Sequence, residues 1–239
     1  MRRIQGSKNK VIIGTMKINF LTLFPEYYSS FTNESIIGKA IENKLIEVNI
    51  VDWRHFATGK QKKVDDTVYG GGKGMLLKVE PIKLALDTVK GIKILVSPQG
   101  KVFNQEMAQK LASENNEITF IAGRYEGFDE RILNYVDEEI SLGDFIVTGG
   151  ELPSMIMADS IIRLVDGVIK KESHELESFN NNLLDFAQYT KPRNFEGYEV
   201  PEVLVNGNHA EIEKWRKESQ IRKTKLNRPD LFERYKNEK

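Results

Sequence analysis

The sequence contains no cysteine and only three histidines. The absence of cysteine excludes disulfides and thiolate metal sites. His55, His174 and His209 lie far apart, and this spacing argues against a structural zinc site. No apolar run approaches the ~18–20 residues of a membrane span. Residues 1–15 are basic with only a short apolar stretch, which does not fit a secretion signal. These features predict a cytoplasmic protein.

An excess of one charge sign is also missing, because 35 basic residues balance 35 acidic ones. Net charge therefore does not predict an acidic or a basic partner. Residues 214–228 are the local exception, with Glu218 as their one acidic residue. A solvated helix face and contact with a nucleic-acid backbone explain this cluster equally well. Its basic residues are Lys214, Arg216, Lys217, Arg222, Lys223, Lys225 and Arg228.

Segments typical of strands alternate with segments typical of helices, which predicts an α/β domain with a largely parallel sheet. Strands are expected at 17–24, 46–53, 92–96, 118–122 and 145–148. Helices are expected at about 26–44, 80–90, 104–114 with Asn104 as N-cap, 128–136 and 154–165.

The domain organisation follows from changes in composition along the chain. Residues 1–15 are expected to form a disordered extension, and 16–168 are expected to form the α/β domain. A polar linker at 169–185 precedes a small, mostly helical domain at 186–239. In that domain we expect a helix at 209–224, capped by Asn208, and another at 229–235.

Residues 118–153 contain two predicted strands that each end in a glycine-rich turn. One turn carries Glu126 and the other carries Glu151. Ligands of open α/β sheets bind beyond the carboxyl ends of the strands. The stretch therefore predicts a pocket, and its carboxylates suit a ligand with positive charge.

Residues 64–75 hold four glycines in five positions. The spacing fits neither a phosphate-binding P-loop nor the dinucleotide-binding G-x-G-x-x-G pattern. A plain flexible connection is one interpretation. A substrate-contacting loop is favoured, because Asp65, Asp66, Tyr69 and Lys73 surround the glycines.

Arg163 lies in an otherwise apolar predicted helix, beside Ile162 and Leu164. Arginine is seldom buried without a partner. Its side chain is therefore either a surface residue at the helix edge or a donor aimed at a substrate oxygen.

Six motifs together resemble one family. They are LTLFPE (21–26), VDDTVYGGGKGM (64–75), SPQG (97–100), GRYEGFDER (123–131), SLGDFIVTGGELP (141–153) and GNHAEIEKWR (207–216). From about residue 17 to 228 the chain strongly resembles the bacterial tRNA (guanine-37 N1)-methyltransferases. The resemblance implies the trefoil-knotted (SPOUT) fold, S-adenosylmethionine as methyl donor, and a homodimer with its active site at the subunit interface.

The resemblance also assigns a cofactor site at the strand ends, with Glu126 as the carboxylate best placed to interact with the cationic sulfonium. The residues it implies are Leu95, Val96, Ser97, Pro98, Gly123, Tyr125, Glu126, Gly127, Ser141, Leu142, Gly143, Asp144, Phe145, Ile146, Val147, Gly149, Gly150 and Pro153.

For catalysis, the resemblance makes Arg163 the donor to guanine O6. The family's general base is an aspartate in an Asp-Ser-Phe motif from the other subunit. Here the motif reads Glu177-Ser178-Phe179, so a glutamate replaces the aspartate. Glu172 and Glu175 are alternative bases. A second departure is Lys73, whose charge could contact an RNA phosphate.

The implied partner is the anticodon stem-loop of a tRNA with G36-G37, bound through the small helical domain. Members of the family are reported to use magnesium, although the sequence shows no dedicated metal site. Two other functions are considered. The guanine-N1 motifs argue against a knotted 2′-O-ribose RNA methyltransferase, and the Glu177 departure alone favours a non-catalytic RNA-binding protein of the same fold.

Overall fold

The computed structural model describes residues 15–72, 74–170 and 177–238. The chain divides into two compact units, Met1–Ile169 and Lys170–Lys239. None of the helices among the described residues is both long and apolar enough to cross a membrane.

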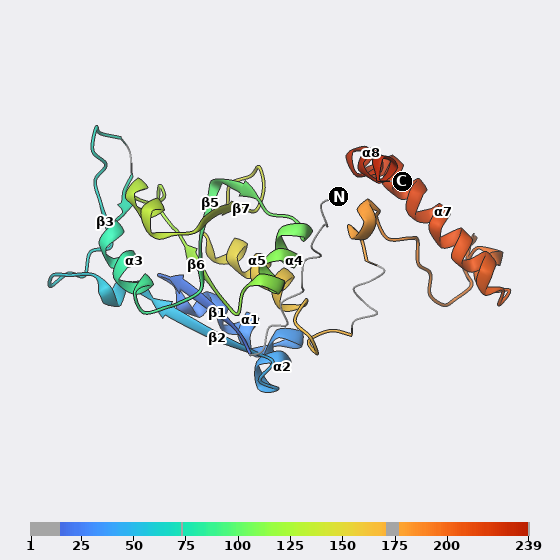
Figure 1. The fold of residues 1–239 in the computed structure, drawn as a ribbon, viewed down its shortest axis with the longest axis horizontal. Coiled ribbons are helices and arrows are strands. Elements are labelled where there is room, and N and C mark those ends of the chain that lie inside the picture. Colours follow the sequence, from blue (N-terminus) through green and yellow to red (C-terminus); the bar gives the residue numbers. More distant parts are fainter. Residues whose placement is uncertain (1–14, 73, 171–176, 239) are drawn as a thin grey trace, which may run out of the picture. The chain divides into compact units, whose positions relative to one another are not determined.

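The first unit is built on a five-stranded sheet with the order β2-β1-β6-β5-β7 (Figure 1). All of its strand pairs are parallel, which confirms the predicted α/β architecture. The strands are β1 (Met16–Thr22), β2 (Ile46–Asp52), β5 (Ile92–Val102), β6 (Glu117–Ala122) and β7 (Glu138–Ser141).

Neighbouring residues of a strand belong to two different hydrophobic cores, one on each face of the sheet. Phe120 is in register with Phe20 and Ile94, and this row packs in the first core. The next row, through Ile121, packs in the second core. Side chains alternate between the faces of a strand. Burial of one side chain of this size stabilises the folded state by about 1.5–3 kcal/mol relative to leaving that side chain exposed to water.

Helices cover both faces, so the unit has three layers. α2 (Ser35–Glu42), α4 (Gln105–Glu114) and α5 (Glu151–Ile162) contribute to the first core. α3 (Val79–Leu86) and the 3-10 turns Trp53–Phe56 and Glu130–Tyr135 contribute to the second. The predicted cap of α4 is confirmed, because Asn104 Oδ1 accepts a hydrogen bond from Met107 N at 2.9 Å.

The helix predicted over 26–44 is divided into three pieces. A 3-10 turn at Pro25–Tyr28 and α1 (Ser29–Asn33) precede α2. The break lies at extended Glu34 and at Ser35, whose φ is 57°. Gly38 allows the two helices to meet there, since a Cβ on Gly38 would lie 2.7 Å from the backbone carbon of Asn33.

The prediction that β5 ends before residues 97–100 is wrong. β5 continues to Val102, and Ile140 of β7 is the partner of both Val96 and Lys101. Residues 97–100 therefore form a bulge. A proline inside a strand is found mainly at bulges or edges, which explains how Pro98 fits within β5.

The helices predicted at 80–90, 128–136 and 154–165 exist with different bounds. α3 ends at Leu86, and the second is the short 3-10 turn Glu130–Tyr135. α5 begins three residues earlier than predicted, at Glu151. The glycine-rich segment joins two short antiparallel strands, β3 (Asp65–Asp66) and β4 (Leu76–Leu77).

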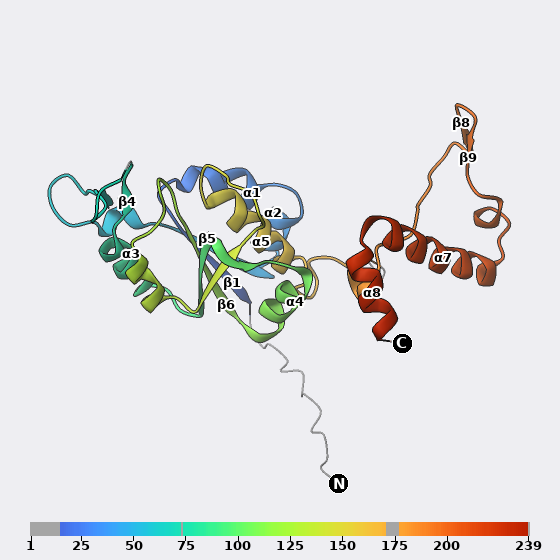
Figure 2. The same cartoon turned by 90° about the horizontal axis from the view of Figure 1, so that it is seen from above.

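The second unit is formed by a long segment of irregular chain and two helices, α7 (His209–Asn227) and α8 (Pro229–Asn237) (Figure 2). The predicted cap of α7 is confirmed, since Asn208 Oδ1 accepts from Glu211 N at 3.4 Å. Its smaller elements are the 3-10 turns Asn180–Asn182 and Glu202–Leu204 and the hairpin of β8 (Asn194–Phe195) with β9 (Tyr198–Glu199).

Two buried hydroxyls attach residues 184–187 to α7. Thr224 Oγ1 accepts from Leu184 N at 2.8 Å, and Ser219 Oγ accepts from Ala187 N at 3.0 Å. Polar side chains at these positions satisfy backbone groups that a regular helix or sheet would otherwise pair. The linker side of the unit is thereby fixed along the helix that carries the basic cluster.

Candidate functional site

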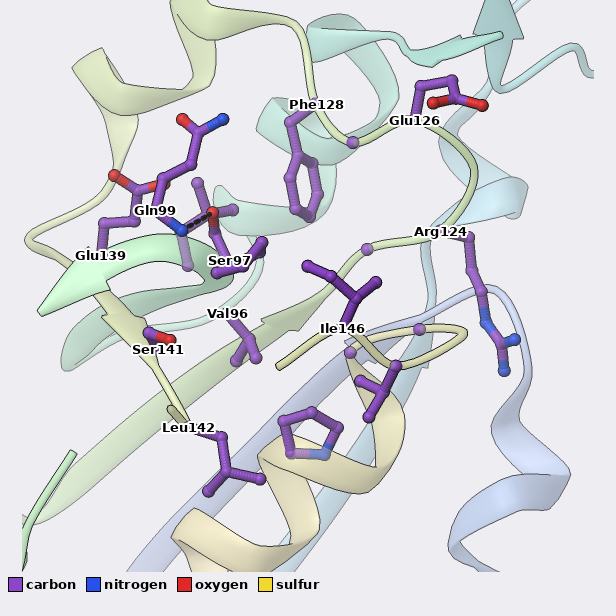
Figure 3. A pocket seen from close by; sticks show the side chains of 18 of the residues that line it. Val96, Ser97, Gln99, Arg124, Glu126, Phe128, Glu139, Ser141, Leu142 and Ile146 are labelled. Carbon is purple, nitrogen blue, oxygen red and sulfur yellow. Dashed lines mark hydrogen bonds between the residues drawn. The ribbon is translucent and has the colours of Figure 1, made fainter. Parts of the chain in front are cut away.

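A pocket of about 370 Å³ lies at the edge of the sheet where β6 and β7 end (Figure 3). Its wall comes from three segments, 95–99, 123–133 and 139–150, together with Pro153. Sites for small molecules occupy roughly 300–1,000 Å³ and are common at this edge of parallel sheets. The geometry therefore supports a ligand site where the glycine-rich turns predicted one.

The structure brings together every predicted cofactor residue except Asp144, which is exposed and does not line the pocket. The contribution of β5 comes from Leu95, Val96, Ser97 and Pro98. The remaining lining residues that were predicted are Gly123, Tyr125, Glu126, Gly127, Ser141, Leu142, Gly143, Phe145, Ile146, Val147, Gly149, Gly150 and Pro153.

Several other lining residues have no separate signal in the sequence. Phe128 is the clearest of them, because its ring lies against Gly123, where a Cβ would be 2.5 Å from the ring. Only the neighbourhood of the glycine turn could have indicated it. The remaining residues of this kind are Gln99, Arg124, Glu130, Ile132, Leu133, Glu139 and Thr148.

The strand predicted at 145–148 is absent, and these residues form a pocket loop instead. The last strand before them is β7, which ends at Ser141. Phe145 is 55% exposed and Ile146 is 81% exposed. A short apolar run has the same sequence pattern whether it is a buried strand or the wall of an apolar site.

The pocket wall is acidic. Glu126, Glu130 and Glu139 line it, whereas its one lining arginine, Arg124, is paired with Glu151. Glu126 is exposed at the rim, and its side chain lies so close to Gly74 that a Cβ there would be 2.4 Å from Glu126 Cγ. Such a wall suits a ligand with positive charge, as the sequence predicted.

The start of α5 is packed directly against the end of β6. Gly150 N donates to Gly123 O at 2.9 Å. A Cβ on Gly150 would lie 2.8 Å from Ala122 Cα, so a residue without a side chain is required. This close approach places the backbone of both glycine turns in one wall of the pocket.

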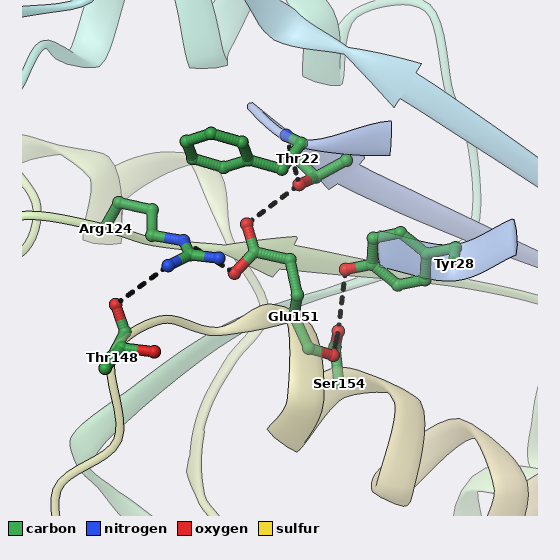
Figure 4. Close-up of polar contacts among 7 residues, drawn as sticks. Thr22, Tyr28, Arg124, Thr148, Glu151 and Ser154 are labelled. Atoms are coloured by element: carbon green, nitrogen blue, oxygen red, sulfur yellow. Dashed lines mark hydrogen bonds and ion pairs between the residues drawn. The ribbon is translucent and has the colours of Figure 1, made fainter. Parts of the chain in front are cut away.

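The expectation that Glu151 is a pocket residue is wrong. Its side chain is buried, and it does not line the pocket. Its Oε2 lies 2.9 Å from Arg124 Nε, and its Oε1 accepts from Thr22 Oγ1 at 2.9 Å (Figure 4). A buried carboxylate requires such partners, and the sequence pattern did not show that they exist.

Arg124 completes this network. Its Nη1 donates to the backbone oxygen of Thr148 at 3.2 Å. Its guanidinium carbon lies 4.6 Å from the ring centre of Phe24 and 4.9 Å from that of Tyr27. Partial burial opposes its charge, but Tyr27 and Glu151 together raise the pKa of Arg124, so the side chain stays cationic.

Tyr28 and Ser154 extend the buried polar contacts. Ser154 Oγ donates to Glu151 O at 2.7 Å, so its only proton is used. The Tyr28 hydroxyl, 2.9 Å away, is therefore the donor to Ser154 Oγ. Burial raises the pKa of Tyr28, which keeps this donor protonated.

Gly149 has no room for a side chain. A Cβ there would lie 2.4 Å from Arg124 Nε and 2.6 Å from Glu151 Oε2. We expect Gly149→Ala to lower the free energy of unfolding by about 1–3 kcal/mol, as overpacking does. Urea denaturation measures this loss. Thr148→Ala, which keeps the backbone acceptor and changes an exposed side chain, is the control, and an equal effect of both changes would contradict the argument.

The two predicted catalytic residues lie in different units. Arg163 follows α5 as its C-cap, is half-buried, and donates from its backbone N to Asp159 O at 3.1 Å. Partial burial raises the pKa of the Asp159 carboxyl, and the charge of Arg163 opposes this shift. Arg163 is thus a cation beside a carboxyl group at the end of the helix that begins at the pocket.

Glu177 is half-buried in the second unit, at the start of a tight loop. Ser178 Oγ accepts from Asp185 N at 3.0 Å, and Phe179 N donates to Leu183 O at 2.7 Å. These bonds close the loop around the Asn180–Asn182 turn. The alternative bases, Glu172 and Glu175, and the unusual Lys73 lie outside the described residues.

Within the part of the chain that the structure describes, no group of three or more His, Asp or Glu side chains could hold a metal ion. The expected use of magnesium gains no support there.

The exposed side chains of the basic cluster include Lys214, Arg222 and Lys225. Others have partners within the unit. Arg216 pairs with Glu213 at 2.6 Å, and Lys217 Nζ lies 4.9 Å from the ring centre of Tyr235. Some side chains of the basic cluster therefore make contacts within the unit, and others are exposed at its surface, where they could contact a ligand.

Known proteins match this chain over both units. The family model described as "tRNA (Guanine-1)-methyltransferase TrmD" matches residues 16–234. Three similar proteins are each named tRNA (guanine-N(1)-)-methyltransferase. That of Mycoplasmopsis pulmonis is 70% identical, that of Mycoplasmopsis agalactiae 66% and that of Mycoplasmopsis synoviae 61%, each over 94% of this chain and 100% of the relative.

Proposed function

Because the chain belongs to the tRNA (guanine-1)-methyltransferase family, we propose that it transfers a methyl group from S-adenosylmethionine to N1 of guanine 37 in tRNA. The observation that carries the proposal is the match over residues 16–234, which includes both the pocket and the basic helix. The same match disfavours a 2′-O-ribose methyltransferase and a non-catalytic RNA-binding protein. The cytoplasm is the expected compartment.

The pocket fits S-adenosylmethionine in size and chemistry. Backbone groups of the glycine turns can approach an adenine closely, and apolar side chains such as Leu95, Leu142 and Ile146 can cover its faces. Glu126, Glu130 and Glu139 provide negative charge for a sulfonium. When bound, this cofactor supplies an electrophilic methyl group.

In the proposed reaction the protein removes the proton from guanine N1 and stabilises the negative charge that develops on guanine O6. N1 of neutral guanine carries a proton, and Glu177 accepts it as general base. As that proton leaves, negative charge builds on O6, and Arg163 stabilises it as a hydrogen-bond donor. Glutamate keeps the carboxylate of the family's aspartate and adds one methylene, so a different rotamer brings it to the same proton.

We place the trefoil knot of the family around the pocket. The chain leaves β7 on one side of β5 and starts α5 at the end of β6, on the other side of β5. The segment 142–150 must therefore cross β5 to reach Gly123. This path past β5 is compatible with the threaded chain of a knot, which is itself exceptional among folds.

We expect two copies of the chain to form the active site together. Large apolar side chains are exposed beside the pocket and along α5, among them Phe145, Ile146, Leu152 and Ile156. An apolar surface of this kind marks an interaction site. In the family the general base comes from the other subunit, so Glu177 of one copy would serve the pocket of its partner.

The proposed substrate contact of the second unit is the anticodon stem-loop with G36-G37. The exposed cations Lys214, Arg222 and Lys225 on α7 suit RNA phosphates. The target base must leave its stack to reach a methyl group held in the pocket. Residues 169–185 connect the unit that contains the pocket to the unit that we expect to bind RNA. We propose that this second unit holds the tRNA while the target base enters a pocket.

The decisive test is methylation of tRNA transcripts with radiolabelled S-adenosylmethionine. We expect a transcript with G36-G37 to be labelled and a matched transcript with A37 to remain unlabelled. Nucleoside analysis of the product should give 1-methylguanosine. A 2′-O-methylated nucleoside would instead establish the ribose methyltransferase, and binding of both transcripts without labelling would establish a non-catalytic protein.

A further inference from the structure

A buried ion pair borders the pocket, and the proposed chemistry uses neither of its members. Glu151 is 1% exposed, and the Arg124 side chain is 15% exposed. A buried ion pair often stabilises a fold less than apolar residues of the same volume would. The geometry around Arg124 indicates that the ion pair maintains the shape of the pocket.

Arg124 contacts two segments that are far apart in the sequence, residues 24–27 and residues 148–151. Its Nε pairs with Glu151 at the start of α5, and its Nη1 donates to the backbone oxygen of Thr148. Its guanidinium also contacts the rings of Phe24 and Tyr27 after β1. Figure 4 shows the guanidinium between Thr148 and Glu151. One side chain thus attaches the end of the pocket loop to the start of α5 and to the turn that follows β1.

The loop held in this way has little packing of its own. Phe145 N donates back to Gly143 O, inside the loop, and the side chains of Phe145 and Ile146 are largely exposed. Both side chains nevertheless line the pocket. Their positions therefore depend on what fixes the backbone at Thr148 and Gly149.

Lysine could not replace Arg124 in this arrangement. The planar guanidinium presents several donors in fixed directions and stacks on aromatic rings, whereas an ammonium is a single point charge. Glu151 is also fixed from its other side, because its Oε1 accepts from Thr22 Oγ1. The carboxylate thus holds the guanidinium, and the guanidinium holds the loop.

We propose that Arg124 is a positioning residue, whose guanidinium, held by Glu151, fixes residues 145–149 in the shape that binds the cofactor. The proposal rests on S-adenosylmethionine as the ligand of the pocket. It assigns no contact with the reacting atoms to Arg124. Its consequence is that cofactor affinity depends on the direction of the donors at residue 124 as well as on its charge.

The test is binding of S-adenosylhomocysteine to the purified full-length protein by calorimetry, which needs neither tRNA nor catalysis. We expect Arg124→Lys to weaken binding at least about tenfold, since it removes a hydrogen bond from a charged donor, which is stronger than a bond between neutral groups. Arg131→Lys, on an exposed pair with Asp129 outside the pocket, is the matched control. It should bind like the wild type.

A pair of further variants separates positioning from stability. Arg124→Met leaves Glu151 buried without its cation, so the melting temperature should fall. The double variant Arg124→Met with Glu151→Gln removes the unpaired charge and should recover part of that loss. We expect its affinity for S-adenosylhomocysteine to stay at least about tenfold below the wild type, because the donor to Thr148 is still missing.

Two results would overturn the inference alone while leaving the proposed function intact. One is equal binding by the wild type and Arg124→Lys. The other is recovery of affinity together with stability in the double variant, which would make the role of Arg124 purely structural. A wild-type protein that binds no S-adenosylhomocysteine would overturn the proposed cofactor, and this inference with it.

Discussion

Substitution of Arg163 by lysine is expected to slow methyl transfer by about 100-fold, the loss that follows removal of one donor to a developing oxyanion. Lysine keeps the positive charge but not the fork of directed donors. Arg163 ends α5, whose first turn is anchored at the pocket through Gly150 and Glu151. The backbone position of residue 163 is thereby tied to the cofactor site. The backbone therefore cannot easily move to compensate for the shorter reach or the different donor direction of a lysine side chain.

Single-turnover methylation of a G37 transcript, with enzyme in excess and saturating S-adenosylmethionine, measures this effect on the chemical step. Arg131→Lys serves again as the control, because its pair with Asp129 is exposed. S-Adenosylhomocysteine binding should be unchanged in both variants. A rate for Arg163→Lys within about threefold of the wild type would exclude Arg163 as the O6 donor, since oxyanion donors contribute far more than that.

The sequence predicted the layers of the first unit well, because its signals are local and periodic. Residues 118–122 are apolar except for Thr119, and all residues of β6 but Glu117 are buried. Asn104 and Asn208 cap helices at the predicted positions. Such features depend on a few neighbouring residues, so the sequence alone carries them.

Apart from the break of the helix predicted over 26–44, the main errors occur where chain segments that are distant in sequence meet. The run 145–148 has the composition of a strand, yet its side chains line a pocket. Ile140 pairs with two separated residues of β5, which no local pattern can show. Glu151 was predicted to be a pocket carboxylate. Its partners Thr22 and Arg124 lie 129 and 27 positions away along the chain, so no local pattern shows that its charge is paired.

The site was predicted by family resemblance more than by the physical pattern. Glycine turns at strand ends predicted a pocket, and the pocket is there. They could not reveal Phe128 or Arg124, which enter the wall through packing against Gly123 and pairing with Glu151. The expected ligand was inferred from the family motifs, because the physical pattern of the residues alone did not identify it.

Glutamine in place of Glu177 is expected to lower the single-turnover rate at least about tenfold, because general-base catalysis contributes roughly 10²–10⁴-fold. Glutamine has the size of glutamate and can still hydrogen-bond, but it cannot accept the N1 proton at neutral pH. Cofactor binding should not change. Glu177 lies in a loop that Ser178 and Phe179 close by hydrogen bonds, so this substitution leaves the backbone in place.

Glu177→Asp is the informative partner variant, because it restores the side chain found in the family. If position 177 supplies the base, aspartate should keep the rate within a few-fold of the wild type or raise it, while glutamine lowers it. Glu233→Gln, on the exposed surface of α8 beside Lys236, controls for the loss of one carboxylate in the same unit. Equal rates for Glu177→Gln and Glu233→Gln would remove Glu177 from the mechanism and direct the search for the base to Glu172 and Glu175. A loss with glutamine but not with aspartate would show that the carboxylate itself performs the chemistry, and an unchanged rate with aspartate would show in addition that the extra methylene is tolerated.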